Sequence, residues 1–482
     1  MTTYKPRILG IIYEAGNFNP LLALAKRGQK SGEFDMMLWS PYALPEGERY
    51  RSEAIQAGSV YIEETTSVGS LGDIHGVLSS WLSVKPPRLP VQAGDSKSRI
   101  FQHKSAADKI LMGLNPDDRL DCLRAADLCE RRTRFCEDWL VRLGIDTVLF
   151  AEDNVERDSF AWIAAARRRG VKTVVSSYGA LSAQEAETAY AHSSSHQLEP
   201  RHQQAVRKHL PHWVRQGADY MITRLPFSEL MGRELFGTAP FDPWLVNSNG
   251  ADHLALESDA MVKIYLDHGF QSGQLIALGN PMHDRLAHIR EQRQDQRTQL
   301  AQRHGFNPES PLIVVAMPPD QRSTRPCPFD SYEQIMEAFG QCPEHETGAA
   351  VIVSPHPNMN QDQKDSFILK GGHLEHVSVA ELLPLADLYI ACVSSTIKWA
   401  LGLGIPVIDF DCYGYNYPDY HQLPQVLSVS TKEDFLAGLT DWHSPEKRAS
   451  LEAAATNGAA KWGGIDGNCL ERLETLCLKE VD

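Results

Sequence analysis

Residues 147–176 read TVLFAEDNVERDSFAWIAAARRRGVKTVVS and contain one complete β-α-β unit. The apolar run Thr147–Ala151 predicts a buried strand, and Asp158–Arg169 predicts a helix that Gly170 ends. A second apolar run, Lys172–Ser176, predicts the next strand. A strand, a helix and a strand at this spacing favour parallel strands joined by a crossover helix.

The same alternation continues on both sides of this unit. Before it, Arg7–Tyr13 and Phe34–Ser40 predict strands, with a helix around Leu21–Arg27 between them. After it, short apolar and longer amphipathic runs predict strands at Tyr220–Thr223, Trp244–Asn247, Leu275–Leu278, Pro311–Ala316, Ala349–Val353, Leu388–Cys392 and Val407–Phe410, and helices at Ser258–His268 and Asp284–His304. We therefore predict an α/β protein of two Rossmann-like domains, each with a parallel sheet flanked by helices, and a cleft between them.

Length and local composition indicate how the domains divide. The 482 residues suit two or three domains, each large enough to bury its own core. We place an N-terminal domain at residues 1–282 and a C-terminal domain at residues 283–482. The polar, His-rich and Gln-rich stretch at residues 181–210 predicts a partly mobile insertion over the cleft, because it has little apolar surface to bury.

Composition excludes several classes of protein. Lys and Arg total 47 against 62 for Asp and Glu, and the net charge of -15 argues against duplex DNA or an anionic membrane as the main partner. Without a signal peptide or a run of about 18 apolar residues, we expect a soluble cytoplasmic protein with at most peripheral membrane contact. The nine cysteines form no CxxC pair, which predicts reduced thiols and no metal site.

Two loops of the C-terminal half carry side chains suited to a phosphate. In an open parallel sheet, ligands gather at the carboxyl ends of the strands. Directly after one strand, His356 stands between Pro355 and Pro357, which restrict the backbone and aim the imidazole, although a rigid turn would explain the motif as well.

The second loop reads CVSSTIK at residues 392–398, where a strand ends and a helix begins. The hydroxyls of Ser394, Ser395 and Thr396 could bind a phosphate at the helix N-terminus, and Lys398 in the first turn could add a charge. Serine at this position is also an ordinary helix cap. Because this loop and the His-Pro loop both follow strands, together they predict a monophosphate or diphosphate site.

Carboxylates of the N-terminal half could supply an acid or a base. Glu152 and Asp153 come directly after the strand at residues 147–151, with a solvated turn as the alternative explanation. Asp252 could act as a nucleophile or base with His253 or His283 nearby, and its alternative is a capping residue.

Three motifs resemble those of GT-B glycosyltransferases and the related nucleotide-sugar 2-epimerases. Gly16–Leu22 resembles their glycine-rich first loop, Ile276–Asp284 their interdomain Gly-Asn-Pro segment, and Ser394–Val407 their donor-site helix, which ends in Gly-x-Pro. The resemblance implies a GT-B fold whose last helix crosses back to the N-terminal domain. It also implies a nucleotide-sugar site in the C-terminal domain, with Asn280 of the interdomain segment among its residues.

The His-Pro loop and the following Ser-Ser pair are similar to the pattern of bacterial sialyltransferases and transferases of 3-deoxy-D-manno-octulosonic acid (Kdo). Val407–Tyr420 also resembles a loop of capsule and lipopolysaccharide Kdo transferases. This resemblance implies a glycosyltransferase that moves Kdo from CMP-Kdo to a glycan or glycolipid acceptor, without a metal or other cofactor. The donor phosphate would be held by His356, Ser394 and Ser395, and an acidic side chain of the N-terminal domain would take part in the reaction.

Two departures bear on the alternatives. Asn17 stands where many relatives have histidine, and Tyr178-Gly179 where the 2-epimerases often have His-Gly. Both disfavour an epimerase, but a UDP-sugar-dependent transferase or a 2-epimerase-like enzyme stays an alternative. A non-catalytic GT-B-derived scaffold that binds glycan or a partner enzyme is the other.

Overall fold

The computed structural model describes residues 4–64, 106–176, 183–191, 193–416, 420 and 422–479. The chain forms two compact units. Unit 1 comprises Met1–Leu256, Val262–Ile276 and Leu470–Asp482, and unit 2 comprises Glu257–Met261 and Ala277–Cys469. The chain therefore passes from unit 1 into unit 2 near residue 276 and returns to unit 1 for its last helix.

Unit 1 is built on a seven-stranded sheet of order β3-β2-β1-β4-β5-β8-β9. The pairings from β3 through β8 are parallel. The strands are β1 (Arg7–Ile11), β2 (Asp35–Ser40), β3 (Val60–Glu63), β4 (Thr147–Phe150), β5 (Lys172–Ser176), β8 (His253–Leu256) and β9 (Leu275–Ala277). The predicted α/β class is confirmed.

The β-α-β unit of residues 147–176 forms as its sequence predicts. Helix α6 (Ser159–Arg169) joins β4 to β5 and ends at Gly170, whose φ of 66° is a conformation that glycine adopts without steric cost. Its Trp162 packs against Trp39 of β2, with ring centroids 5.9 Å apart. Apolar contacts of this kind hold α6 on the sheet and fix the position of the loop between β4 and α6.

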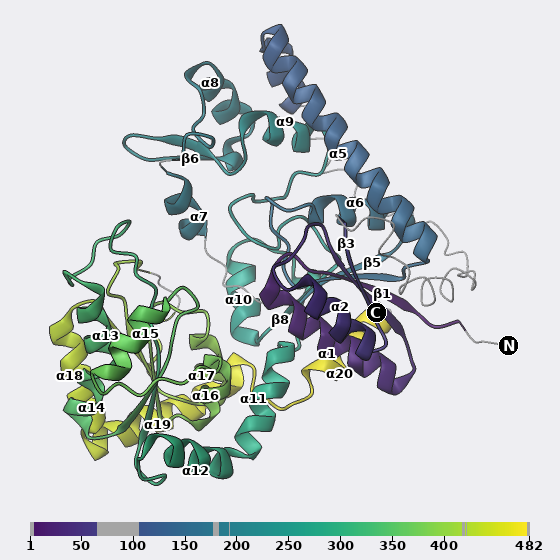
Figure 1. The fold of residues 1–482 in the computed structure, drawn as a ribbon. Coiled ribbons are helices and arrows are strands. Elements are labelled where there is room, and N and C mark those ends of the chain that lie inside the picture. Colours follow the sequence, from purple (N-terminus) through teal and green to yellow (C-terminus); the bar gives the residue numbers. More distant parts are fainter. Residues whose placement is uncertain are drawn as a thin grey trace. The chain divides into compact units, whose positions relative to one another are not determined.

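Helices cover both faces of this sheet (Figure 1). One side carries α6 and part of α5 (Pro116–Leu143), and the other carries α1 (Ala15–Ser31), α2 (Gly47–Gln56) and α20 (Cys469–Leu478). The last helix is tied to unit 1 by the Thr147 hydroxyl, which donates to the Cys477 carbonyl at 2.8 Å. An ion pair between Arg27 and Glu474 joins α20 to α1.

Several predicted elements differ from the structure, each for a local reason. The glycine-rich first loop is part of α1, which begins at Ala15 and contains Pro20. Trp244–Asn247 is not a strand, because Asn247 has a φ of 64° and turns the chain. The single helix predicted at residues 284–304 is two helices, α11 (Pro281–Glu291) and α12 (Arg293–His304), which meet at Gln292.

The stretch at residues 181–210 was predicted to be a partly mobile polar insertion because it has little apolar surface to bury, yet its described residues include helices and buried side chains. They contain α7 (Ala183–Tyr190) and α8 (Pro200–His209). Val206 is fully buried, and His202 stacks on Phe227 of α9 (Phe227–Phe236) with ring centroids 3.9 Å apart. Figure 1 shows α8 and α9 beside the N-terminal half of α5. The few apolar side chains therefore suffice, because α5 and α9 supply a partner surface.

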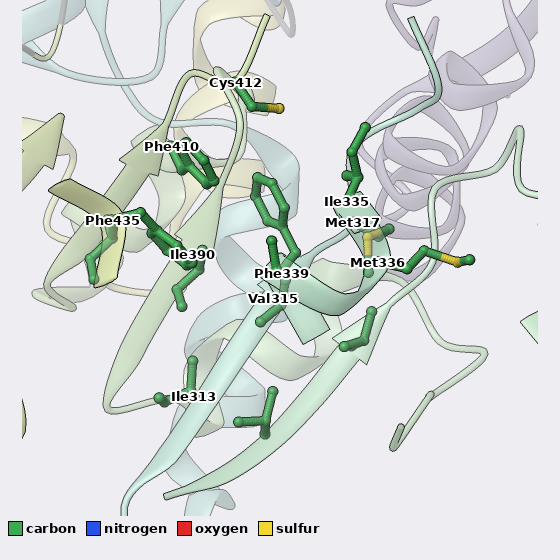
Figure 2. Close-up of a cluster of buried hydrophobic side chains, with 14 of the residues drawn as sticks. Ile313, Val315, Met317, Ile335, Met336, Phe339, Ile390, Phe410, Cys412 and Phe435 are labelled. Atoms are coloured by element: carbon green, nitrogen blue, oxygen red, sulfur yellow. The ribbon is translucent and has the colours of Figure 1, made fainter. Parts of the chain in front are cut away.

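Unit 2 contains a five-stranded parallel sheet of order β11-β10-β12-β13-β14. Its strands are β10 (Leu312–Ala316), β11 (Ala350–Ser354), β12 (Leu388–Ala391), β13 (Val407–Phe410) and β14 (Val426–Val429), and the helices around it include α13 (Tyr332–Gly340), α14 (Cys342–Thr347), α15 (Gln361–Leu369), α16 (Val379–Leu382), α17 (Ile397–Leu403), α18 (Lys432–His443) and α19 (Pro445–Gly458). Figure 2 shows the core on one face, where Phe410 of β13, Phe339 and Phe435 belong to one cluster. Its ring centroid is 5.2 Å from that of Phe339 and 4.6 Å from that of Phe435. This packing fixes the strand ends that carry the predicted phosphate site.

Candidate functional site

In unit 1, polar side chains gather after the carboxyl ends of three neighbouring strands. Glu14 follows β1, Tyr42 follows β2 and Glu152 follows β4. Arg157, from the loop before α6, forms an ion pair of 3.0 Å with Glu14, and its guanidinium lies 5.7 Å from the ring centroid of Tyr42. The Tyr42 hydroxyl donates to the Tyr13 carbonyl. These contacts hold the edge of the sheet around Glu152.

Glu152 is the carboxylate of this group whose environment suits proton transfer. It is partly exposed, and the Asn154 amide donates to it at 3.3 Å. Burial raises the pKa of Glu152 above the ordinary range of glutamate, and the negative charge of Glu14 raises it further. A carboxylate with a raised pKa is a stronger base, so Glu152 can accept a proton from a hydroxyl group.

Asp153 has a different environment from its neighbour. It is 0% exposed, and its carboxylate accepts from the Ser159 hydroxyl at 2.5 Å, from the Asn249 side chain at 2.5 Å and from the Asn249 backbone at 3.0 Å. Burial raises the pKa of Asp153, while these donors oppose the rise. The sequence predicted a catalytic role for this residue, and the structure shows a buried carboxylate that joins the loop after β4 to Ser159 and Asn249.

Asp252 lies at the other edge of the sheet. It directly precedes β8, and its carboxylate accepts from the Thr173 backbone at 2.8 Å and hydroxyl at 2.7 Å near the start of β5. Parallel strands place these residues at the amino edge, whereas Glu152 is at the carboxyl edge. The structure therefore does not bring Asp252 together with Glu152, and the Asp252 carboxylate bonds to the neighbouring strand β5.

In unit 2, His356 follows β11 and is partly buried. Its Nδ1 accepts from the Asn358 backbone N–H at 3.1 Å, so a neutral ring carries its proton on Nε2. Burial lowers the pKa of His356, which favours this neutral form. The imidazole therefore presents an N–H donor. Pro357 is exposed and keeps the loop rigid.

The loop that carries the three hydroxyl side chains, at residues 392–396, follows β12. Val393 has a φ of 46°, and its N–H donates to the Asp409 carboxylate at 2.8 Å, so Asp409 holds a strained residue at the start of the loop. The Ser394 and Thr396 hydroxyls are 2.7 Å apart and bond to each other. Among the described residues, none hydrogen-bonds to the Ser395 hydroxyl, which is partly exposed. Ser395 is thus the hydroxyl of this loop that can bind a ligand without losing an internal bond.

The sheet places both loops at its carboxyl edge. Strands β11 and β12 each pair with β10, so the two loops are two strand spacings apart, about 10 Å. The loop after β10 lies between them. This spacing allows two phosphate oxygens of a nucleotide, or the phosphate and the group beside it, to be held by separate loops.

Two residues predicted to bind the donor, Lys398 and Asn280, are buried and make contacts within the chain. Lys398 is 3% exposed, and its ammonium lies 2.9 Å from the Glu257 carboxylate, so its charge is already compensated inside unit 2. Asn280 is 2% exposed and caps α11, with its side-chain oxygen accepting from the Met282 N–H at 2.9 Å. The ion pair of Lys398 could not be predicted from the sequence, because Glu257 is far from Lys398 in the chain.

Replacing Lys398 with methionine is expected to destabilise unit 2 by about 3–5 kcal/mol, because Glu257 would remain buried without its partner. The matched control is Lys447→Met, which breaks an exposed ion pair with Asp441 and should cost about 0–1 kcal/mol. Urea unfolding of both variants measures the difference. Equal stability of the two variants would contradict the role assigned to the buried pair.

The sequence analysis did not predict several residues whose contacts join loops at the carboxyl edges of the two sheets. The Tyr413 hydroxyl donates to the Pro319 carbonyl at 2.6 Å, which joins the loop after β13 to the loop after β10. The Arg325 guanidinium lies 3.9 Å from the ring centroid of Tyr415, on the same two loops. In unit 1, Glu14 and Tyr42 were missed as well, although each closely follows a strand. Inspecting the end of every predicted strand would have found these two.

Parts of the prediction fall outside the described residues, namely Tyr178-Gly179 and residues 417–419 of the segment that resembles Kdo transferases. Within the described ranges, no three His, Cys, Asp or Glu side chains are grouped as metal ligands. No helix in those ranges is long and apolar enough to cross a membrane.

No protein-family model and no curated protein matches this chain. Solved structures do match its fold. The UDP-GlcNAc 2-epimerase of Neisseria meningitidis, bound to UDP-GlcNAc, is 12% identical over 98% of this chain and 100% of its own, with a TM-score of 0.50. The S. aureus MnaA–UDP complex is 11% identical over 98% of this chain and 95% of its own, also with a TM-score of 0.50. A glycosyltransferase of Rickettsia africae is 10% identical over 99% of this chain, with a TM-score of 0.48.

The first two similarities extend over almost the whole chain and over both units. The protein therefore has the GT-B type of fold, with two α/β units that each contain a parallel sheet flanked by helices. This is the fold that the sequence motifs implied.

Proposed function

We propose that this protein is a glycosyltransferase that uses a nucleotide sugar, with CMP-Kdo as the donor and a glycan as the acceptor. The observation that carries the proposal is the state of His356, a neutral imidazole whose Nε2–H is available at the carboxyl edge of the sheet in unit 2. The choice of CMP-Kdo rests on the resemblance of the His-Pro and Ser-Ser loops to Kdo transferases. Nucleotide-sugar binding by proteins of this fold supports the donor class.

The proposed reaction divides its work between the two units. Glu152 removes the proton from an acceptor hydroxyl, and that oxygen forms a bond to the anomeric carbon of the sugar. The bond from this carbon to the phosphate oxygen breaks, and CMP leaves as an anion. His356 and Ser395 donate hydrogen bonds to the phosphate and stabilise the negative charge that develops there. The reaction requires that Glu152 act on an acceptor while His356 and Ser395 hold the phosphate of the donor.

Nucleotide binding tests the donor class directly. We expect CMP to raise the Tm of the protein more than CDP, UDP or GDP at equal concentration, because a ligand that binds only the folded state stabilises it. His356→Ala should abolish most of the CMP effect, whereas His345→Ala should not, since the His345 side chain is 87% exposed on α14. Differential scanning fluorimetry measures both.

The other outcomes of this measurement point to the alternatives. A larger effect of UDP would favour a UDP-sugar transferase or a 2-epimerase-like enzyme on the same fold. No effect of any nucleotide would favour a scaffold that binds glycan without catalysis.

A further inference from the structure

Unit 1 contains a cavity of about 460 Å³ that the proposed reaction does not use. It lies beside α6, whose residues Phe160, Ile163, Ala164 and Arg167 recur at helical spacing and so form one wall. Other walls come from residues 237–241, 247–251 and 269–274. A cavity of this size falls within the range of about 300–1,000 Å³ that is typical of small-molecule sites.

Arg167 is the lining residue whose charge is not paired with a carboxylate of the described chain. It begins a run of three arginines, and the other two are paired: Arg168 lies 3.1 Å from the Glu130 carboxylate, and Arg169 lies 2.6 Å from that of Glu137. Among the described residues, no carboxylate pairs with Arg167. One of its N–H groups donates to the Gly250 carbonyl at 3.0 Å, and the rest of the guanidinium is exposed.

Apart from Arg167 and Glu234, the described lining residues are uncharged. Phe241 and Phe270 meet edge to face, with ring centroids 4.7 Å apart, and supply an apolar surface together with Phe160. The Gln274 amide donates to the Ala251 carbonyl at 3.0 Å, so its oxygen can accept from a ligand. Glu234 also lines the cavity, but its side chain is fully buried and accepts from Trp213 at 2.6 Å.

One unpaired acceptor lies among the lining residues. The side-chain oxygen of Asn249 is buried and has no hydrogen-bond partner among the described residues. Buried polar atoms are normally paired, so this oxygen is a candidate for a bond to a ligand or to water. Aromatic rings, amide and hydroxyl oxygens and one cation suit a sugar ring, which has C–H groups on its face and hydroxyl donors around its edge.

We propose that this cavity binds a sugar that carries one carboxylate, with the carboxylate on Arg167 and the ring against Phe160 and Phe270. A guanidinium matches a carboxylate in both charge and geometry. Among the described lining residues, Arg167 is the one cationic side chain. Because Glu234 also lines the cavity, a phosphate dianion would bring one more uncompensated negative charge than a carboxylate, so the lining favours a carboxylated sugar over a sugar phosphate. The proposal depends on unit 1 alone and not on the donor assignment.

Ligand-detected NMR on the full chain, with D-glucuronate, D-glucose and glucose 6-phosphate at millimolar concentration, tests the charge requirement. We expect glucuronate to bind more tightly than either of the other sugars. Arg167→Met should weaken glucuronate binding about tenfold and leave glucose binding unchanged, because the variant removes one charge-assisted bond. The matched control is Arg168→Met on the same helix, which should bind glucuronate as the wild type does.

A second variant tests the location independently of charge. Ala164→Leu adds volume to the α6 wall and should weaken glucuronate and glucose together. Equal binding of glucose and glucuronate to the wild type, tighter binding of glucose 6-phosphate, or no effect of either Arg167→Met or Ala164→Leu would overturn the proposal.

The source of the ligand is either a glycan chain or a free sugar acid. An oligosaccharide that ends in glucuronate distinguishes these sources. If it binds more tightly than the monosaccharide, the site holds the end of a glycan, and if it binds no more tightly, the site holds a free sugar acid. A failure of all sugars to bind would leave the CMP measurement untouched, since that measurement reports on unit 2.

Discussion

Replacing Glu152 with glutamine is expected to lower kcat by about 10²- to 10⁴-fold, the range for loss of a general base. The amide is similar in size and can still bond to Asn154, so the fold and the donor affinity should change little. Steady-state kinetics with CMP-Kdo and a glycan acceptor measure kcat and KM separately. A loss confined to KM would show that Glu152 binds substrate rather than moves a proton.

The pH profile of the wild type gives an independent test of the same role. A base acts in its deprotonated form, so kcat/KM should fall as the pH drops through the pKa of Glu152. Because burial and Glu14 raise this pKa, the fall should begin at a higher pH than for an ordinary glutamate. In Glu152→Gln, this acidic limb should disappear.

The neighbouring carboxylate provides a control for the Glu152 variant. Asp153→Asn replaces an acceptor of three hydrogen bonds with an amide that must accept from Asn249, and it should cost about 1–3 kcal/mol of stability. The fall of kcat/KM at acidic pH should remain in the Asp153→Asn variant. If Asp153→Asn removed the limb and Glu152→Gln did not, the two roles would have been assigned the wrong way round.

Replacing His356 with alanine is expected to lower kcat by about 10²- to 10³-fold, as removal of one donor to a developing negative charge does. The loss follows from the missing Nε2–H, while the core of unit 2 stays intact because His356 is only partly buried. His345→Ala should keep full activity. Near-normal turnover of CMP-Kdo by His356→Ala would remove the donor assignment.

The fold could be predicted from the sequence because its signals are local. The strand-helix-strand pattern of residues 147–176 depends on apolar runs and on Gly170, all close together in the chain. The predictions that failed concern segments whose structure depends on residues far away in the chain. Helix α8 packs against α5 and α9, and no local pattern contains that surface. Gln292 separates two helices without proline or glycine, so the break left no signal in the sequence.

The site was predicted less well for the same reason. The rule that ligands meet strand ends located Glu152, His356 and Ser395 correctly at carboxyl edges. It could not separate Glu152 from Asp153, because the difference lies in burial and in hydrogen bonds from Ser159 and Asn249. It also assigned Lys398 to the donor, since Glu257 approaches it only in the folded chain.

Helix α20 has a consequence for biosynthesis. It completes unit 1 through contacts with Thr147, Lys172 and Arg27, yet it begins only where unit 2 ends in the chain, at Cys469. On the ribosome, domains generally fold as they emerge, from the N-terminus onward. Here the unit that is synthesised first must wait for the last helix, so the inserted unit can finish folding before the unit that encloses it in the sequence.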